Sequence, residues 1–494
     1  MRTIPDALLR AEAIHSPKTA FVCEGRERTF GEFVDRCRRV GNVLSDFEVG
    51  PGKKVALLAA NSDTYAELYA GVPSSGRAIV PLNSRWAEPE LAYALEDAGA
   101  EILISDRDPG VLRDSVNQVL SLEEYEHHLS TSEPMEFAEV KEDDLAGLFY
   151  TGGTTGQSKG VMLSHRNLMA NTLHSQITMP LGSEDTYLII APMFHAAGSN
   201  SVLQCIALGI SQVVVPTFEP NLCLDLIETH RCSATLAVPT MVAALIEAQA
   251  ANARDASSLT LIAHGASPIA TEVLRRAHEE FPTAELLHLY GATETAPLVT
   301  GLRHEENLIG TSRGKSVGHP CLGVSLRIDA QDGDAGEVLV NGPNVMQGYW
   351  NKPDQTAAVL EDGWYRTGDI GYLDDGGYLY LVDRAKDMII SGGENVYCSE
   401  VEEIIYQHSK VLEATVFGIP HEQWGEQVHA VVVPRDESLS ETELIDFCRT
   451  SLGGYKLPRS VQFRSEELPK SGPGKVLKRE LRAPFWEGKD RSIN

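Results

Sequence analysis

The amino-acid sequence predicts an α/β protein, with a large N-terminal region of stacked α/β sheets and a small β unit, followed by a smaller, mobile α/β domain. Three observations support this fold class. The chain has 494 residues, which is too many for a single hydrophobic core. Short aliphatic runs alternate with amphipathic helical patterns, which is typical of largely parallel sheets covered by helices. The pattern then changes twice, near residues 317 and 383.

The aliphatic runs are the predicted strands of the N-terminal region. Each run has four to six residues and is followed by turn residues and a helical pattern. In chain order, the runs are Val55–Ala60, Ala78–Leu82, Ile102–Ser105, Leu188–Ala191, Val213–Pro216, Leu259–Ala263 and Leu286–Tyr290. A polar stretch over residues 111–144 interrupts them and is expected to be a connecting arm.

After residue 317 the predicted strands are separated by Gly and Asp, as in a small antiparallel unit. They are Val324–Ile328, Gly336–Asn341 and Tyr378–Val382. A fresh α/β alternation then begins, which predicts one domain over residues 1–382 and a mobile domain over residues 383–494. Within the second domain, Ser399 and Ser440 each precede a Glu by three residues, which predicts a capping box at the start of two helices.

Composition excludes several classes of protein. With 42 basic and 70 acidic residues, the net charge of −28 argues against nucleic acid as a partner, because that binding depends on Lys and Arg neutralising phosphates. No signal peptide and no apolar stretch near the roughly 18 residues of a membrane span is found, so a cytoplasmic protein is expected. The eight cysteines are scattered singly, which favours reduced thiols over disulfides or a zinc site. The sequence does not indicate the oligomeric state.

A glycine- and threonine-rich run over residues 150–160, YTGGTTGQSKG, is the most informative segment. Its four glycines expose backbone N–H groups, its three threonines add hydroxyl donors, and Lys159 adds a positive charge. That combination suits a polyphosphate, whose oxygens need many converging donors. The spacing is not that of a Walker A loop. The alternative is a flexible surface turn, although turns more often carry Asn, Asp or Pro.

Three later segments add to a nucleotide site. HGASP, over residues 264–268, follows a predicted strand, where open α/β sheets place their ligands. LYGATET, over residues 289–295, and GWYRTGD, over residues 363–369, each carry a carboxylate beside small or hydroxyl residues. Taken alone, the Thr293–Glu294 pair would be expected to cap a helix.

Taken in this order, the segments resemble those of the adenylate-forming superfamily. This superfamily contains acyl- and aryl-CoA ligases, the adenylation domains of peptide synthetases, and luciferases. The chain departs from the family pattern at Gly152, where the family has Ser, and at Ser158, where it has Pro. The first change removes one hydroxyl donor and the second loosens the turn, and neither removes the remaining glycines or Lys159.

The resemblance implies that ATP and Mg²⁺ bind to the N-terminal region. The implied ATP ligands are Thr151, Gly153, Thr154, Thr155, Gly156, Lys159, Gly265, Ala266, Ser267, Tyr290, Gly291, Asp369 and Arg384. Thr293 is implied to contact the α-phosphate, and Glu294 to hold Mg²⁺ together with Thr155. Lys475, in a glycine-flanked loop of the mobile domain, matches the family's adenylation lysine. There a compact cation would stabilise the charge that builds in the transition state.

The resemblance also implies an acid pocket and a CoA tunnel. The acid pocket would be lined by His195, also a candidate catalytic residue, and by Ala197, Gly198 and Leu289. The alternative for His195 is a buried histidine with satisfied hydrogen bonds. Rotation of the small domain about Asp383 would exchange the lysine loop for a face that guides the thiol of CoA. That face comprises Gly392, Gly393, Glu394 and Lys456.

The activity implied is that of an ATP-dependent carboxylic acid–CoA ligase, which forms an acyl-adenylate and then a thioester on a medium-sized hydrophobic acid, aromatic or fatty. The segment GENV, over residues 393–396, is like that of CoA ligases, and no carrier-protein domain is expected after Lys475. One alternative is an adenylating ligase that passes an acid or another oxyanion to an amine or a carrier protein. A second is a non-catalytic relative, which predicts damaged motifs that are not found.

Lys475→Ala is expected to abolish acid-dependent pyrophosphate exchange and to spare thioester formation from supplied acyl-adenylate, because the lysine is needed only for the first step. Measuring both half-reactions on one preparation checks this. Loss of both together would argue against the rotating-domain mechanism.

Overall fold

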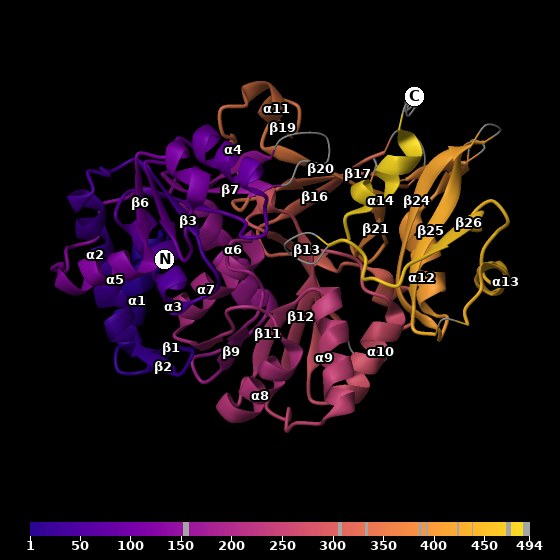
Figure 1. Ribbon diagram of the computed structural model, residues 1–494, viewed down its shortest axis with the longest axis horizontal. Helices are drawn as coiled ribbons and strands as arrows, with labels where there is room; N and C mark the ends of the chain where they lie inside the picture. Colours follow the sequence, from indigo (N-terminus) through magenta and orange to yellow (C-terminus); the bar gives the residue numbers. More distant parts are fainter. Residues whose placement is uncertain are drawn as a thin grey trace.

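The computed structural model describes residues 1–151, 158–304, 309–330, 334–384, 388–391, 394–421, 424–436, 438–470 and 476–487. Four β-sheets organise these residues (Figure 1). Two large, mainly parallel sheets and a small antiparallel sheet precede residue 385, and a fourth sheet lies in the C-terminal lobe. No helix among the described residues has the length and apolar character to cross a membrane.

The largest sheet carries the strand ends that position the candidate site. The pairs β1–β10, β10–β9, β9–β11, β11–β12 and β12–β13 are parallel. The pairs β1–β2, β13–β14 and β14–β15 are antiparallel. In sheet order, the strands are β15 (His319–Pro320), β14 (Leu298–His304), β13 (Glu285–Gly291), β12 (Leu261–Gly265), β11 (Ala234–Ala237), β9 (Thr186–Ile189), β10 (Ser211–Val214), β1 (Thr19–Cys23) and β2 (Arg26–Thr29).

The second large sheet holds the strands that flank the glycine- and threonine-rich run. β7 pairs parallel with β4, and antiparallel with β8, which in turn pairs antiparallel with β18. In sheet order, the strands are β18 (Gly348–Tyr349), β8 (Lys159–Ser164), β7 (Leu145–Thr151), β4 (Ala78–Pro81), β3 (Lys54–Leu58), β5 (Ile102–Ser105) and β6 (Gln118–Ser121).

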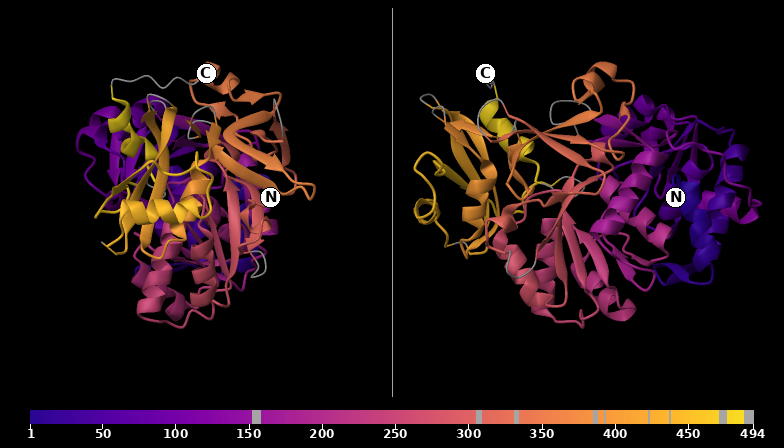
Figure 2. Two further views of the ribbon diagram at one scale, coloured as in Figure 1. Left: turned by 90° about the vertical axis from the view of Figure 1, so that its right-hand side faces the viewer. Right: turned by 180° about the vertical axis from the view of Figure 1, so that it is seen from behind.

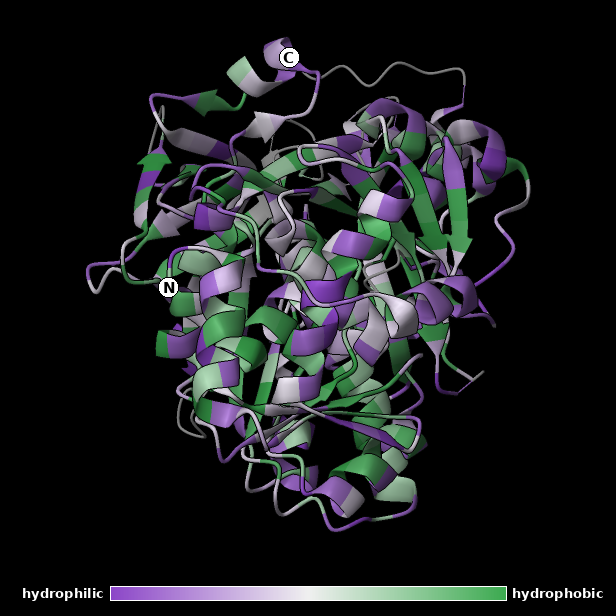
Figure 3. Cartoon of the chain, turned by 90° about the vertical axis from the view of Figure 1, so that its left-hand side faces the viewer, coloured by the Kyte–Doolittle hydropathy of each residue, from purple (hydrophilic) through white to green (hydrophobic). Residues whose placement is uncertain are grey.

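Helices cover both faces of the two large sheets. The core between the sheets is built from residues of α1 (Ile4–His15), α2 (Phe30–Asp46), α3 (Asp63–Ser74), α6 (His165–Thr178) and α7 (Ala196–Leu208). The outer face of the largest sheet packs against α8 (Pro220–His230), α9 (Pro239–Ala251) and α10 (Thr271–Glu280). α4 (Glu88–Ala98) covers the outer face of the second sheet. The helices in Figure 3 carry hydrophilic and hydrophobic residues side by side, as their amphipathic patterns predicted.

The small antiparallel sheet contains the strand with Asp369. Its strands are β16 (Ser325–Asp329), β17 (Gly336–Asn341), β20 (Trp364–Leu373), β19 (Leu360–Glu361) and β21 (Leu379–Arg384). The fourth sheet contains β23 (Glu394–Val396), β22 (Ile389–Ser391), β25 (Gly425–Pro434), β24 (Val411–His421) and β26 (Ser460–Phe463). Its helices are α12 (Cys398–Tyr406), α13 (Glu441–Arg449) and α14 (Lys478–Trp486), which complete the C-terminal lobe (Figures 1 and 2).

The last strand of the third sheet ends at Arg384 and the first of the fourth begins at Ile389. The boundary at residue 383 stays a prediction. A bridging carboxylate joins the lobe to the N-terminal region: Glu247 on α9 pairs with Arg276 on α10 at 2.6 Å and with Arg435 of the lobe at 3.0 Å. Ion pairs at the surface contribute only about 0–1 kcal/mol each, so this contact does not fix the lobe in place.

Two local expectations were wrong. The predicted connecting arm contains a short 3₁₀ helix (Gly110–Ser115), β6 and α5 (Leu122–Thr131), because Tyr125 of α5 packs in the core. Ser399 is not a helix cap: it lies inside α12, and its hydroxyl donates to the Val382 carbonyl at 2.8 Å. Ser440 does cap α13 by accepting from the Glu443 N–H.

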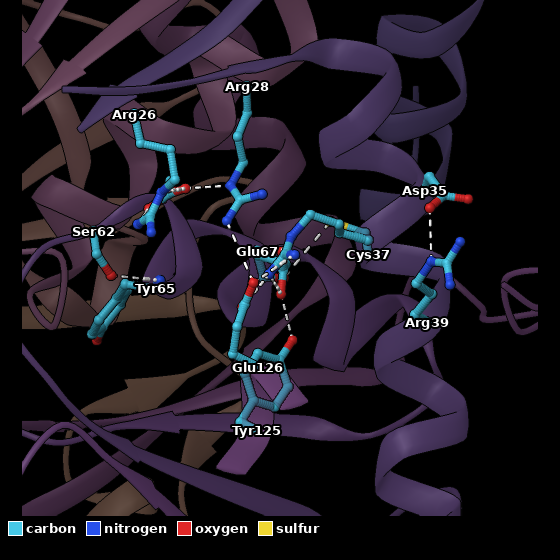
Figure 4. A network of polar contacts seen from close by, with 12 residues as sticks. Arg26, Arg28, Asp35, Cys37, Arg39, Ser62, Tyr65, Glu67, Tyr125 and Glu126 are labelled. Carbon is cyan, nitrogen blue, oxygen red and sulfur yellow. Dashed lines mark hydrogen bonds and ion pairs between the residues drawn. The ribbon is translucent and has the colours of Figure 1, made fainter. Parts of the chain in front are cut away.

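A buried charge network explains why α5 packs there (Figure 4). The fully buried carboxylate of Glu67 on α3 pairs with Arg36 on α2 and accepts the hydroxyl of Tyr125. Arg36 also donates to Glu126, which is on α5 beside Tyr125. Burial raises the pKa of Glu67, and removing one partner of such a pair costs about 3–5 kcal/mol. The network therefore joins three helices at the N-terminal end of the fold.

Lowering the pH from about 6.5 toward 4 is expected to lower the melting temperature. Burial lowers the pKa of His165 to about 4, and its neutral Nδ1 accepts the N–H of Ile4 at 3.3 Å. Between the folded pKa and the ordinary value of about 6.5, mainly the unfolded chain binds the proton. The free energy of unfolding therefore decreases as the pH is lowered, by up to about 1.4 kcal/mol per pH unit for each such group.

Melting curves at pH 7, 6 and 5 check this prediction, and His165→Gln should flatten the dependence because it removes one titrating group. A melting temperature that stays constant or rises toward pH 5 would contradict it.

Candidate active site

Two strands of the largest sheet, β12 and β13, end in glycines that allow the neighbouring backbone to approach closely. A side chain at Gly265, at the end of β12, would overlap the Leu289 carbonyl oxygen of β13. One at Gly291, at the end of β13, would overlap the Pro297 carbonyl oxygen. Ala266 follows Gly265 with a positive φ of 67°, so the chain turns sharply there. The two strand ends that carry predicted ATP ligands therefore lie side by side.

Tyr290 and Asp369 come together from different sheets. The Tyr290 hydroxyl, at the end of β13, donates to the Asp369 carboxylate of β20 at 2.7 Å. Asp369 lies opposite Arg384 in the β20–β21 pairing. The side chains of Asp383 and Arg384 lie outside the described residues, so the structure gives only their backbone positions. A carboxylate held by a tyrosine beside an open strand end is suited to bind a ribose diol.

Glu294 lies on a 3₁₀ turn, Thr293–Thr295, that directly follows the end of β13. Its carboxylate accepts the Tyr349 hydroxyl at 2.9 Å, and its carbonyl accepts the Met346 N–H at 2.9 Å. Lys159, the first residue of β8, lies with its Nζ 4.7 Å from the centre of the Tyr349 ring. Thr151 is opposite Lys159 in the β7–β8 pairing.

This arrangement fits Mg²⁺ bound together with a nucleotide. Among the described residues, no three His, Cys, Asp or Glu side chains converge as an all-protein metal site. Mg²⁺ bound to a polyphosphate needs only one or two carboxylates, because phosphates and waters supply the other oxygens. Glu294 would be that carboxylate, and the bound ion would offset the negative charge of the phosphates.

Three of the residues predicted to line an acid pocket, His195, Ala197 and Gly198, lie at the start of α7. His195 is the N-cap residue of α7, and burial lowers its pKa to about 4, so the ring is neutral at physiological pH. Gly198 lines a narrow gap beneath this helix that is too small to admit a water molecule. The other lining residues are Tyr187, Ile189, Ile190, Ala191, Ser201 and Leu236. Ala197 on the same helix and Leu289 on β13 are partly buried.

Several predicted site residues lie outside the described residues. These are Gly153, Thr154, Thr155, Gly156, Gly392, Gly393 and Lys475, together with the side chain of Glu394. Ser267 follows the β12 turn and is partly buried. Lys456, a predicted CoA contact, is paired with both carboxylate oxygens of Glu400 at 2.7 Å. CoA phosphate would therefore have to displace Glu400 from this lysine.

The sequence reasoning missed the residues that connect the predicted pieces. Tyr349 contacts both Glu294 and Lys159, and Tyr187 lines the gap with Ser201. No local spacing signals the first contact, because 55 residues separate Tyr349 from Glu294. The position of Ser201 offered a weak signal, since it lies one helical turn after Ala197 on the predicted pocket helix.

Comparison with known proteins now identifies the family. The sequence matches the AMP-binding enzyme family over residues 9–350 and the AMP-binding enzyme C-terminal domain over residues 400–475. The chain belongs to the AMP-binding enzyme family.

Two relatives of this AMP-binding enzyme show the range of its neighbours. It is 37% identical to a feruloyl-CoA synthase from an Amycolatopsis species, over 93% of this chain and 94% of that protein. It is 33% identical to the fatty acid–[acyl-carrier-protein] ligase ScoC of Streptomyces coeruleorubidus, over 98% of this chain and 96% of that protein.

A solved structure aligns over nearly the whole chain. The o-succinylbenzoate coenzyme A synthetase of Bacillus subtilis, in complex with ATP and magnesium ion, has a TM-score of 0.86 and 29% identity, over 96% of this chain and 98% of that chain.

These findings confirm the predicted fold class, a mixed α/β protein with a large N-terminal domain and a smaller C-terminal one. They also confirm the predicted reaction. The AMP-binding enzyme is an ATP-dependent, AMP-forming acid–CoA ligase for an aromatic or fatty acid, with Mg²⁺ as the metal. The roles of individual site residues stay predictions.

Asp369→Ala is expected to raise the KM for ATP by about 10- to 100-fold, because charge-assisted hydrogen bonds contribute roughly 1.5–3 kcal/mol each. Tyr290→Phe, which removes only the hydroxyl that Asp369 accepts, should raise it less. Pyrophosphate exchange at several ATP concentrations measures both. An unchanged KM for ATP in Asp369→Ala would remove this residue from the nucleotide site.

Proposed function

We propose that the acid is a hydroxylated aromatic acid with a short unsaturated spacer between the ring and the carboxylate. The observation that carries this proposal is the 37% identity to a feruloyl-CoA synthase over 93% of the chain. Two hydroxyl groups, those of Tyr187 and Ser201, lie in the narrow gap beneath α7, which would have to widen to admit a ring. The substrate class is thus narrower than the aromatic or fatty acids of the family's reaction.

The two hydroxyls suit a ring that carries a hydroxyl of its own. The Tyr187 hydroxyl lies 3.3 Å from Ser201 Oγ, and Ser201 also donates to the Ala197 carbonyl at 3.2 Å. Burial raises the pKa of Tyr187 well above its usual range, so the phenol stays protonated and donates to Ser201, and the two hydroxyl oxygens can accept from a ring hydroxyl. An aliphatic chain in the same place would contact these hydroxyls without forming hydrogen bonds to them.

The reaction proceeds in two displacements. In the first, a carboxylate oxygen of the acid bonds to the α-phosphorus of ATP and the bond to pyrophosphate breaks. In the second, the sulfur of CoA bonds to the acyl carbon, the bond to AMP breaks, and the thiol proton passes to solvent. Adenylation is needed because AMP is a far better leaving group than the bare carboxylate oxygen.

We assign roles in the first displacement to residues of the N-terminal region and to Lys475. Asp369 and Tyr290 would hold the ribose and adenine, while Lys159 and Glu294 would face the phosphates and metal. His195, neutral because its pKa is about 4, adds no charge that would compete with Lys475 for the carboxylate. When bound, Mg²⁺ would reduce the repulsion between the phosphates and the incoming carboxylate.

For the second displacement we propose that the domain over residues 383–494 rotates about Asp383 and presents Gly392, Gly393 and Glu394 to the thiol. The weak Glu247–Arg435 contact supports this proposal, because it is a surface ion pair that opposes rotation little. We also propose that the enzyme works in the cytoplasm, where ATP and CoA are both available. The singly scattered cysteines agree with a reducing compartment.

One relative supports a second acceptor. ScoC, 33% identical over 98% of the chain, is a fatty acid–[acyl-carrier-protein] ligase. An enzyme of that kind would release pyrophosphate when it adenylates the acid, would release AMP only on transfer to its carrier protein, and would form no CoA thioester. Incubating hydroxylated arylpropenoic acids and saturated fatty acids with ATP, Mg²⁺ and CoA, and assaying pyrophosphate and CoA thioester separately, decides between the two acceptors.

In the same assay, kcat/KM should be higher for hydroxylated arylpropenoic acids than for saturated fatty acids of similar length. Ser201→Ala should reduce the preference for a ring-hydroxylated acid over its unsubstituted analogue by about 2- to 10-fold, since one neutral hydrogen bond contributes roughly 0.5–1.5 kcal/mol. A preference for fatty acids in the unaltered enzyme would refute the proposed substrate class. An unchanged ratio in Ser201→Ala would remove Ser201 from substrate recognition.

A further inference from the structure

Tyr349 occupies a fixed position between the two charged groups of the nucleotide site. It is the second residue of β18, and it pairs with Val161 of β8 two residues after Lys159. Its side chain is only 6% exposed and belongs to the core between the two large sheets, as does Tyr365. A ring packed in this way has little freedom to change rotamer, so groups that contact it are held in turn.

The side chain of Tyr349 makes two different contacts. Its hydroxyl donates to Glu294 Oε1 at 2.9 Å, and its ring face lies 4.7 Å from the Lys159 ammonium. Burial and the neighbouring Glu294 charge raise the pKa of Tyr349 well above its usual range, so the hydroxyl remains a donor. One residue therefore orients both an anion and a cation at the site.

The segment that carries Tyr349 also fixes the main chain around Glu294. The Met346 N–H donates to the Glu294 carbonyl at 2.9 Å. The Asn344 side-chain amide donates to the carbonyls of Thr295 and Leu298, both at 2.9 Å. Residues 344–349 thus hold the acidic turn through its backbone as well as through its carboxylate.

We propose that Tyr349 is a positioning residue for Mg²⁺-bound ATP, orienting the Glu294 carboxylate with its hydroxyl and the Lys159 ammonium with its ring, so that both converge on the same metal–polyphosphate group. This inference depends on the role of Glu294 as the metal ligand under the proposed function. Groups that orient a metal-binding carboxylate typically change metal affinity or activity by about 10- to 100-fold when they are removed.

The test is Tyr349→Phe in the full-length chain, which removes the hydroxyl and keeps the ring over Lys159. Binding of ATP with Mg²⁺, measured by calorimetry without acid or CoA, should weaken by about 10-fold. Binding of ATP in EDTA should change little, because the carboxylate then has no metal to meet. Thioester formation from supplied acyl-adenylate should be preserved.

Tyr380→Phe is the matched control. Its hydroxyl donates to the Asp374 carboxylate at 3.3 Å, so it also removes one tyrosine–carboxylate hydrogen bond, but outside the Tyr349 contacts. It should leave both ATP-binding measurements unchanged. A Tyr349→Phe variant that weakens ATP binding equally with Mg²⁺ and in EDTA, or that lowers both half-reactions together, would show a merely structural role and overturn the inference.

The variant Glu294→Gln distinguishes a failure of the inference about Tyr349 from a failure of the proposed metal role of Glu294. If Glu294→Gln weakens binding of Mg²⁺-bound ATP and Tyr349→Phe does not, the inference about Tyr349 is wrong and the metal role of Glu294 stands. If neither variant weakens it, the metal role of Glu294 is wrong and the inference falls with it. A metal-specific loss in both variants supports the inference.

Discussion

The nucleotide site depends on how closely β12, β13 and the chain after β13 approach one another. Gly265 and Gly291 stand where any side chain would overlap a carbonyl oxygen of the neighbouring segment. Because these two positions are glycines, the turn with Thr293 and Glu294 can follow the end of β13 after a single residue, Ala292. The hydrogen bonds of Tyr290 with Asp369 and of Tyr349 with Glu294 both involve residues at or just after this strand end, so they depend on its position.

Tyr349 contacts two charged side chains of the candidate nucleotide site. The Lys159 ammonium lies over its ring and the Glu294 carboxylate accepts its hydroxyl, so the proposed metal ligand and the proposed phosphate-binding cation keep a fixed relation. His195 contributes a neutral ring to the acid pocket, since its pKa is about 4. The buried charge pairs around Glu67 lie on the helices at the N-terminal end and join elements of the fold away from the candidate site.

The features that could be predicted from the sequence are those determined by local residue patterns. Runs of β-branched and aliphatic residues located the parallel strands to within a few residues, as with Leu259–Ala263 against β12 at Leu261–Gly265. It failed where tertiary contacts decide. Ser399 has the spacing of a cap, yet the N-cap of the helix is Tyr397, two residues earlier, and the Ser399 hydroxyl donates to the Val382 carbonyl. Tyr349 is invisible as a site residue because its two partners lie far from it in the chain.

The proposed acid pocket differs from the nucleotide site in that residues of the hydrophobic core form its walls. Tyr187 and Ile189 line the gap and also belong to the core between the sheets, and Ile190 belongs to the core on the outer face. Enlarging or reducing these side chains would strain or loosen the core, typically by 1–3 kcal/mol or more. Ala197 and Leu289 are only partly buried, so they tolerate changes of volume at lower cost to stability. A change in acid preference is therefore expected to arise at these two positions first, while the deeper walls keep both the fold and the hydroxyl pair.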